Sequence, residues 1–139
     1  MNPKLFVQIL VTVAMSGALS FAATTPEQAA QKSAEQWLAL VDAGKYSQSW
    51  KETAPYFQRN VPQDQWEVNG KHIRESFGNV ISRKLKSAQY TKSVPGAADG
   101  EYVILQFDTS FAKKKSAVET ITPMRDKDGH WKVSGYFVK

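Results

Sequence analysis

The stretch from Tyr102 to Phe111 constrains the fold most, because apolar residues alternate along its whole length. An Asp99-Gly100 turn signal precedes it. Successive side chains of a strand point to opposite faces, so this pattern predicts one strongly apolar face and one mixed face that carries Asp108. A strand of this kind needs other elements to cover its apolar face, which is typical of a central sheet strand. The apolar face consists of Val103, Leu105, Phe107, Thr109 and Phe111.

The N-terminus has the pattern of a secretory signal peptide. Lys4 provides a positive charge, residues 5–14 are largely apolar, and small residues occur at Ser20 and Ala22. This arrangement predicts a signal peptide over residues 1–22, with cleavage between Ala22 and Ala23. The apolar run is shorter than the roughly 20 residues that span a bilayer. We therefore expect no stable membrane anchor after cleavage.

The remaining residues 23–139 have the size of a single domain. The sequence has no cysteine, which excludes disulfides, thiol catalysis and thiolate metal sites. The net charge of +5 is modest and spread along the chain, so nucleic acid is not an expected partner. Four Trp, five Tyr and seven Phe supply enough apolar surface for a core without disulfides. We expect a periplasmic or secreted bacterial protein.

The first half of the mature chain has helical periodicity. Thr25 and Pro26 begin a predicted helix over 26–43, which ends before Gly44. A second helix is expected near 46–54, with Pro55 causing a kink or a fresh turn. A third is expected from Pro62 to residue 77, with three apolar residues on one side: Trp66, Ile73 and Phe77.

The second half alternates as strands do. We expect strands at 80–92, with a bulge near Ser87, and then at 102–111, 117–125 and 130–138. A loop over 112–116 would carry three consecutive lysines, and Asp128-Gly129 predicts a tight hairpin. On the last strand, Trp131, Val133 and Phe137 would share a side. Helices followed by hairpin-linked strands predict an α+β domain, with the helices on one face of a four-stranded antiparallel meander.

Recognisable catalytic motifs are absent from the sequence. The two histidines, His72 and His130, have no His, Asp or Glu at the spacing expected of metal ligands. There is neither a nucleophile-elbow serine nor a glycine-rich phosphate loop. We therefore predict no metal, no cofactor and no catalytic residue.

Charged residues within the predicted strands are the candidate binding residues. They would form either a polar cluster in a cavity or cross-strand ion pairs on the solvent side of the sheet. The position of Asp108 on the mixed face favours solvent, whereas the strand of Glu119 is mixed on both faces. With the last-strand tyrosine, the candidates for ligand or partner binding are Arg83, Asp108, Glu119, Arg125 and Tyr136.

Several blocks together resemble a known family. They are residues 37–46, 49–50, 82–85, 95–102, 106–111, 119–120 and 135–137. In this order they resemble the bacterial exported family of domain of unknown function 4019, over nearly the whole mature chain. The resemblance implies an exported one-domain protein without an assigned activity. The order of elements is also similar to the α+β cone folds of the SnoaL and nuclear-transport-factor type.

Two functions remain open at this point. One is a non-enzymatic module that binds an unidentified periplasmic protein or small molecule. The other is a small cone-fold enzyme of isomerase or hydrolase type, with Glu119 or Asp108 as general base and Arg83 as charge stabiliser. The enzyme hypothesis fails if all three side chains face solvent, and it gains if two of them converge in a cavity of a few hundred Å³.

Overall fold

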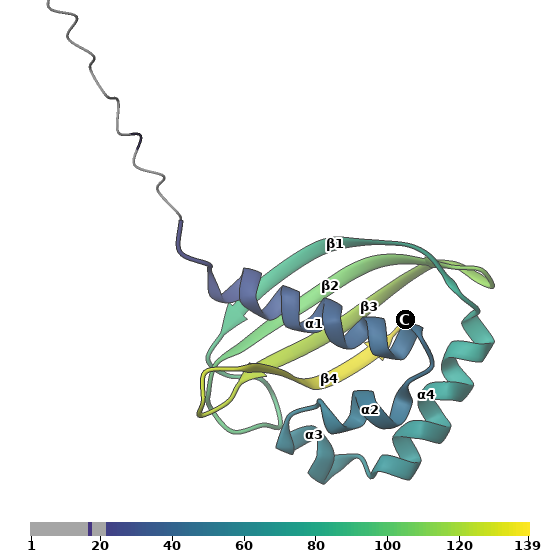
Figure 1. Ribbon diagram of the computed structural model, residues 1–139, viewed down its shortest axis with the longest axis horizontal. Coiled ribbons are helices and arrows are strands. Elements are labelled where there is room, and N and C mark those ends of the chain that lie inside the picture. Colours follow the sequence, from purple (N-terminus) through teal and green to yellow (C-terminus); the bar gives the residue numbers. More distant parts are fainter. Residues whose placement is uncertain (1–16, 18–21) are drawn as a thin grey trace, which may run out of the picture.

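A computed structural model describes residue 17 and residues 22–139 of the chain. Within these described residues, four helices lie on one side of an open four-stranded sheet, and none of them covers the opposite face (Figure 1). The predicted signal peptide falls almost entirely outside the described residues. Ala22 and Ala23 are exposed just before the first helix. None of the helices described is long and apolar enough to cross a membrane.

Helix α1 (Pro26–Asp42) agrees with the prediction from its sequence. The Thr25 side chain accepts a hydrogen bond from the backbone N–H of Gln28, and the Gln28 side chain accepts one from the N–H of Thr25. This capping box satisfies two N–H groups that a helix start otherwise leaves unpaired. The buried face of α1 consists of Ala30, Ala34, Trp37, Leu38 and Val41.

The chain after α1 forms two short helices, α2 (Tyr46–Lys51) and α3 (Pro55–Asn60), rather than one kinked helix. Pro55 occupies the first turn of α3, where its missing N–H has no helical partner to lose. Helix α4 (Gln63–Phe77) was predicted within one residue. Of the three apolar residues predicted on one side, Trp66 is buried and Phe77 packs against Phe111, but the prediction was wrong for Ile73, which is turned toward solvent. Gly70 and Arg74 are buried with Trp66 instead.

The sheet is an antiparallel meander in the order β1 (Val80–Thr91), β2 (Tyr102–Phe111), β3 (Lys114–Arg125) and β4 (Trp131–Val138). This confirms the predicted α+β fold. The expected loop over 112–116 was too long, because a tight turn at Ala112 and Lys113 suffices to reverse the chain. Lys114 and Lys115 therefore belong to β3.

Bulges decide which side chains face the helices. The predicted bulge in β1 lies between Leu85 and Ser87, and a second irregularity near Ile81 turns that side chain outward. An unpredicted bulge in β4 lies between Val133 and Gly135. Because one extra residue exchanges the faces of a strand, Phe137 lies on the open face and is 58% exposed.

The core lies between α1, α4 and the covered face of the sheet. It contains the apolar side chains of β2 that the alternating pattern predicted, together with Trp37 and Trp66. Gly70 lets α2 approach α4 closely, because a methyl group there would lie 3.3 Å from the ring of Tyr46. One group of polar side chains is buried beside this apolar core.

Candidate functional site

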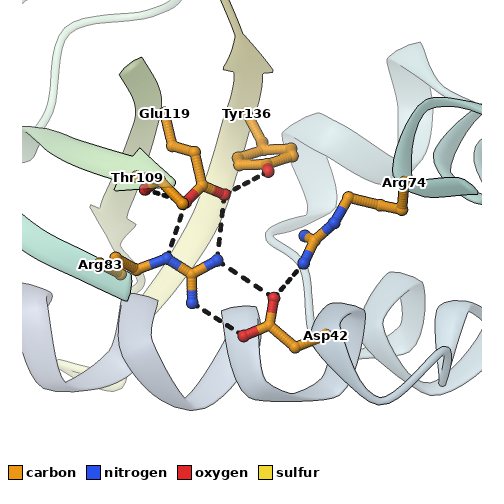
Figure 2. A network of polar contacts seen from close by, with 6 residues as sticks. All are labelled: Asp42, Arg74, Arg83, Thr109, Glu119 and Tyr136. Carbon is orange, nitrogen blue, oxygen red and sulfur yellow. Dashed lines mark hydrogen bonds and ion pairs between the residues drawn. The ribbon is translucent and has the colours of Figure 1, made fainter. Parts of the chain in front are cut away.

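Each of the four strands contributes one polar side chain to a row across the covered face of the sheet. Figure 2 shows these side chains converging with two from the helices. Arg83 on β1 is the register partner of Thr109 on β2, and Glu119 lies on β3 beside Phe107. The β4 bulge brings Tyr136 to the same face. The network consists of Asp42, Arg74, Arg83, Thr109, Glu119 and Tyr136.

Glu119 is fully buried at the centre of this network. Its Oε1 accepts hydrogen bonds from Arg83 Nε at 2.7 Å and from Thr109 Oγ1 at 2.6 Å. Its Oε2 accepts from Arg83 Nη2 at 3.2 Å and from the hydroxyl of Tyr136. A carboxylate has about four lone-pair sites. All four are taken, so no site is left to accept a proton from a substrate.

Asp42 and Arg74 connect the network to the helices. Asp42, the last residue of α1, accepts hydrogen bonds from Arg83 Nη1 at 2.8 Å and Nη2 at 3.1 Å. Arg74 of α4 donates to the same carboxylate. Two carboxylates thus face two guanidinium groups, and the cluster is electrically neutral. It joins α1 and α4 to the strands that carry Arg83 and Glu119.

Burial and charge shift the pKa of three members. Burial alone would raise the pKa of Asp42, but hydrogen bonds from Arg83 and Arg74 outweigh it and hold that pKa below its usual value. Burial alone would lower the pKa of Arg83, but its bonds to Asp42 and Glu119 raise it. Burial, followed by the charge of Glu119, raises the pKa of Tyr136 well above that of a free tyrosine. These shifts keep Asp42 and Arg83 charged and Tyr136 protonated at neutral pH.

One polar atom of the network has no hydrogen-bond partner among the described residues. It is Nη1 of Arg74, a side chain that is 7% exposed. The guanidinium carbon lies 5.2 Å from the centre of the Phe111 ring. A cation over an aromatic face is attracted by the electrons of the ring, which offsets part of the missing hydrogen bond.

The structure brings together three of the five residues predicted as a site: Arg83, Glu119 and Tyr136. The other two lie apart. Asp108 is exposed on the open face, as its position on the mixed side of the strand indicated. Arg125 pairs with Glu101 at 3.4 Å, where β3 ends beside the start of β2.

The sequence analysis missed Asp42, Arg74 and Thr109. Asp42 carried a usable signal, because an acid in the last turn of a helix is unfavourable unless a cation is near. Arg74 follows Trp66 and Gly70 at helical spacing, which indicates the buried face of α4. Thr109 interrupts the apolar face of β2, and a hydroxyl buried there needs a partner.

The turn between β3 and β4 brings ligand atoms of Asp126, Asp128 and His130 within 4.8 Å of one another, so the expectation that His130 has no Asp at metal-ligand spacing was wrong. A tight turn places residues two and four apart side by side. Asp126 Oδ1 accepts hydrogen bonds from the backbone N–H groups of Asp128 at 3.0 Å and His130 at 2.9 Å. These bonds explain why the three side chains lie together: Asp126 stabilises the turn that contains all three residues.

Two grooves open near the covered face of the sheet. One, of about 480 Å³, is lined by Asp42 and Arg74 but not by Arg83 or Glu119. The other, of about 570 Å³, lies between α1, α2 and the first half of β4, and we call it the α1–β4 groove. Its floor includes Trp37, Trp131 and Val133.

These features define a class of α+β proteins in which helices cover one face of an open antiparallel meander. Within that class, the chain belongs to the family described as "Protein of unknown function (DUF4019)", whose model matches residues 33–136. No protein of curated function matches the chain in sequence. A solved structure from Catenulispora acidiphila, determined at 2.5 Å, is similar with a TM-score of 0.51 and 12% identity. The match covers 80% of this chain and 88% of that one, and at this identity it shows the fold alone.

Proposed function

We propose that this protein is a small non-enzymatic module that binds a small molecule or a protein outside the cytoplasm. The observation that carries the proposal is that hydrogen bonds occupy every acceptor position of the buried Glu119 carboxylate. A general base needs a free lone pair within hydrogen-bond reach of its substrate. Glu119 has no exposed surface, and four hydrogen bonds from three side chains occupy its two oxygens.

The alternative, a cone-fold enzyme with a strand carboxylate as base, has less support. Arg83 and Glu119 do converge, and the enzyme hypothesis required two of the three charged side chains to converge in a cavity. However, neither lines the groove of about 480 Å³ that borders their network. Asp108, the other candidate base, is exposed on the open face of the sheet. A base in that position lacks the water-excluding surroundings that tune a catalytic carboxylate.

The α1–β4 groove is the binding surface that we propose. Its volume of about 570 Å³ lies within the range of roughly 300–1,000 Å³ found for small-molecule sites. Aromatic side chains in its floor combine with polar residues on its walls, which is the usual composition of such sites.

A ligand screen by thermal shift tests this assignment, combined with a variant that fills the groove. We expect a ligand that raises the melting temperature of the wild-type protein and loses this effect with Gln36→Trp, because Gln36 lines the groove. Glu35→Trp is the matched control, since Glu35 is exposed on α1 but does not line the groove. A ligand whose effect survives Gln36→Trp would place binding elsewhere. Turnover of a ligand by the wild-type protein would contradict the non-enzymatic assignment.

We also propose export, which the charged and apolar pattern of residues 1–22 supports. Cell fractionation followed by intact-mass measurement tests it in a bacterium that expresses the full chain. The expected product is a periplasmic or secreted protein that begins at Ala23. A full-length chain retained in the cytoplasm would contradict export.

A further inference from the structure

We propose that the α1–β4 groove binds a short peptide with free amino and carboxyl termini. This inference rests on the proposed function and names the class of ligand. It is based on how opposite charges and side-chain amides are distributed around the groove.

The two walls of the groove carry opposite charges. Lys32 projects from α1, and Glu52 follows α2 on the other wall. Neither side chain forms an ion pair within the described part of the chain, although both line the same groove. Lys132 also lines the groove from β4, but it pairs with Asp126 at 3.8 Å. A ligand would therefore find a cationic wall and an anionic wall.

Lys32 and Glu52 each have a side-chain amide one helical turn away. Gln36 lies four residues after Lys32, and Gln48 lies four residues before Glu52, so each pair shares a helix face. Both glutamines line the groove and are exposed, and neither amide is hydrogen-bonded to another described side chain or backbone group. An amide side chain both donates and accepts, as a peptide bond does.

The floor between the walls is apolar and held in place. Trp131 and Val133 of β4 and Trp37 of α1 contribute to it. The hydroxyl of Ser33 donates to the carbonyl of Trp131, and the backbone N–H of Ala54 donates to the carbonyl of Val133 at 2.8 Å. These bonds fix both walls to the edge of β4, so the groove is formed before a ligand arrives.

A zwitterionic peptide matches this distribution better than other small molecules. Its carboxylate would lie near Lys32, its ammonium group near Glu52, and its amide bond between Gln36 and Gln48. A purely anionic ligand would be repelled by Glu52, and a purely cationic one by Lys32. A purely apolar one would desolvate charges without pairing them.

The test is a titration of the purified protein with alanyl-leucyl-alanine, followed by NMR of the side-chain amides of Gln36 and Gln48. We expect both amides to shift with the free peptide. N-acetylation or C-terminal amidation of the peptide should each weaken binding about fivefold, the effect of one exposed ion pair.

Two exposed variants identify which wall binds which terminus. Lys32→Gln should bind the free peptide and its C-terminal amide equally, because the carboxylate has lost its partner. Glu52→Gln should bind the free and the N-acetylated peptides equally. Lys51→Gln is the control, because Lys51 neighbours Glu52 without lining the groove, and it should behave as the wild type does.

The possible results distinguish a failure of the peptide inference from a failure of the proposed binding function. Absence of shifts at millimolar peptide, or equal affinity for capped and free peptides, would overturn the peptide inference. The binding function would still stand if another ligand from the screen bound in the groove. Preference for vesicles of phosphatidylethanolamine over peptide would also overturn the peptide inference, because that headgroup is zwitterionic. Hydrolysis of the peptide would keep the ligand class and contradict the non-enzymatic function.

Discussion

Glu119 is buried with no contact with solvent, which is unfavourable for a carboxylate unless its oxygens are fully paired. Arg83 pairs with it through two hydrogen bonds, and Thr109 and Tyr136 complete its partners. Burying such a pair contributes little net stability, but removing one partner leaves an uncompensated charge. The network therefore connects the helices to the sheet, and each of its members needs the others to remain paired.

Replacing Glu119 by Gln should destabilise the protein strongly. Arg83 would lose one of its two charged partners and keep only Asp42, and breaking a buried pair in this way costs about 3 kcal/mol or more. Asp108→Asn is the control on the open face, and we expect it to change the free energy of unfolding by less than about 0.5 kcal/mol. Urea unfolding followed by tryptophan fluorescence measures both. Equal effects of the two substitutions would show that Glu119 is not held as described.

Tyr136 makes stability depend on pH in the alkaline range. Burial and the charge of Glu119 raise its pKa in the folded state, whereas the unfolded value is near 10.0. The stabilisation is therefore fully present below pH 10 and is lost as the pH rises above it. We expect the urea midpoint to fall above pH 10, and to fall less steeply in Tyr136→Phe. Identical slopes in the two proteins would contradict the burial of this hydroxyl.

At the scale of elements, local sequence patterns predicted the positions of helices and strands well. They predicted less well which side of each element faces the core. The caps of α1 and the alternation of β2 are local features, and both were predicted correctly. The bulge in β4 was not predicted, because the apolar and polar residues of 133–137 fit a strand pattern with or without a bulge. Pairing with β3 selects the register that turns Tyr136 inward and Phe137 outward.

The two faces of the sheet should therefore respond differently to truncation of an aromatic side chain. Phe107→Ala removes a fully buried ring of β2 and should cost about 3–5 kcal/mol. Phe137→Ala removes a largely exposed ring and should cost less than about 0.5 kcal/mol. Thermal unfolding of both variants measures the difference. A large loss for Phe137→Ala would mean that this ring is buried, against the register of β4.

The junction between α4 and β1 depends on a glycine. Gly78 has a φ of +75°, and a methyl group there would lie 3.1 Å from Cβ of Ala112. A positive φ with a ψ of −169° is a conformation that essentially only glycine adopts and that costs other residues about 1–3 kcal/mol, so Gly78→Ala should lower stability by at least about 1 kcal/mol. Gly135→Ala is the control, because its φ is not positive and no neighbour lies within 4 Å. Calorimetry should show a loss for Gly78→Ala alone.

At the scale of the whole molecule, the sequence predicted the layers and half of the polar network. Arg83, Glu119 and Tyr136 were candidates because charged or polar residues in strands need an explanation. Asp42, Arg74 and Thr109 were missed because their roles depend on how the helix layer lies over the sheet, which local periodicity does not encode. The same holds for the α1–β4 groove, whose walls come together only when α1 and α2 pack beside β4.

The central claim is that a mutually dependent polar network joins the helices to the sheet and leaves Glu119 unavailable for catalysis. A double-mutant cycle of Arg83→Gln and Glu119→Gln in urea unfolding tests it most directly. Because the two side chains share two hydrogen bonds in the core, the double variant should be more stable than the sum of the single losses implies, by about 1–3 kcal/mol. Additive losses, with no coupling between Arg83 and Glu119, would contradict the account.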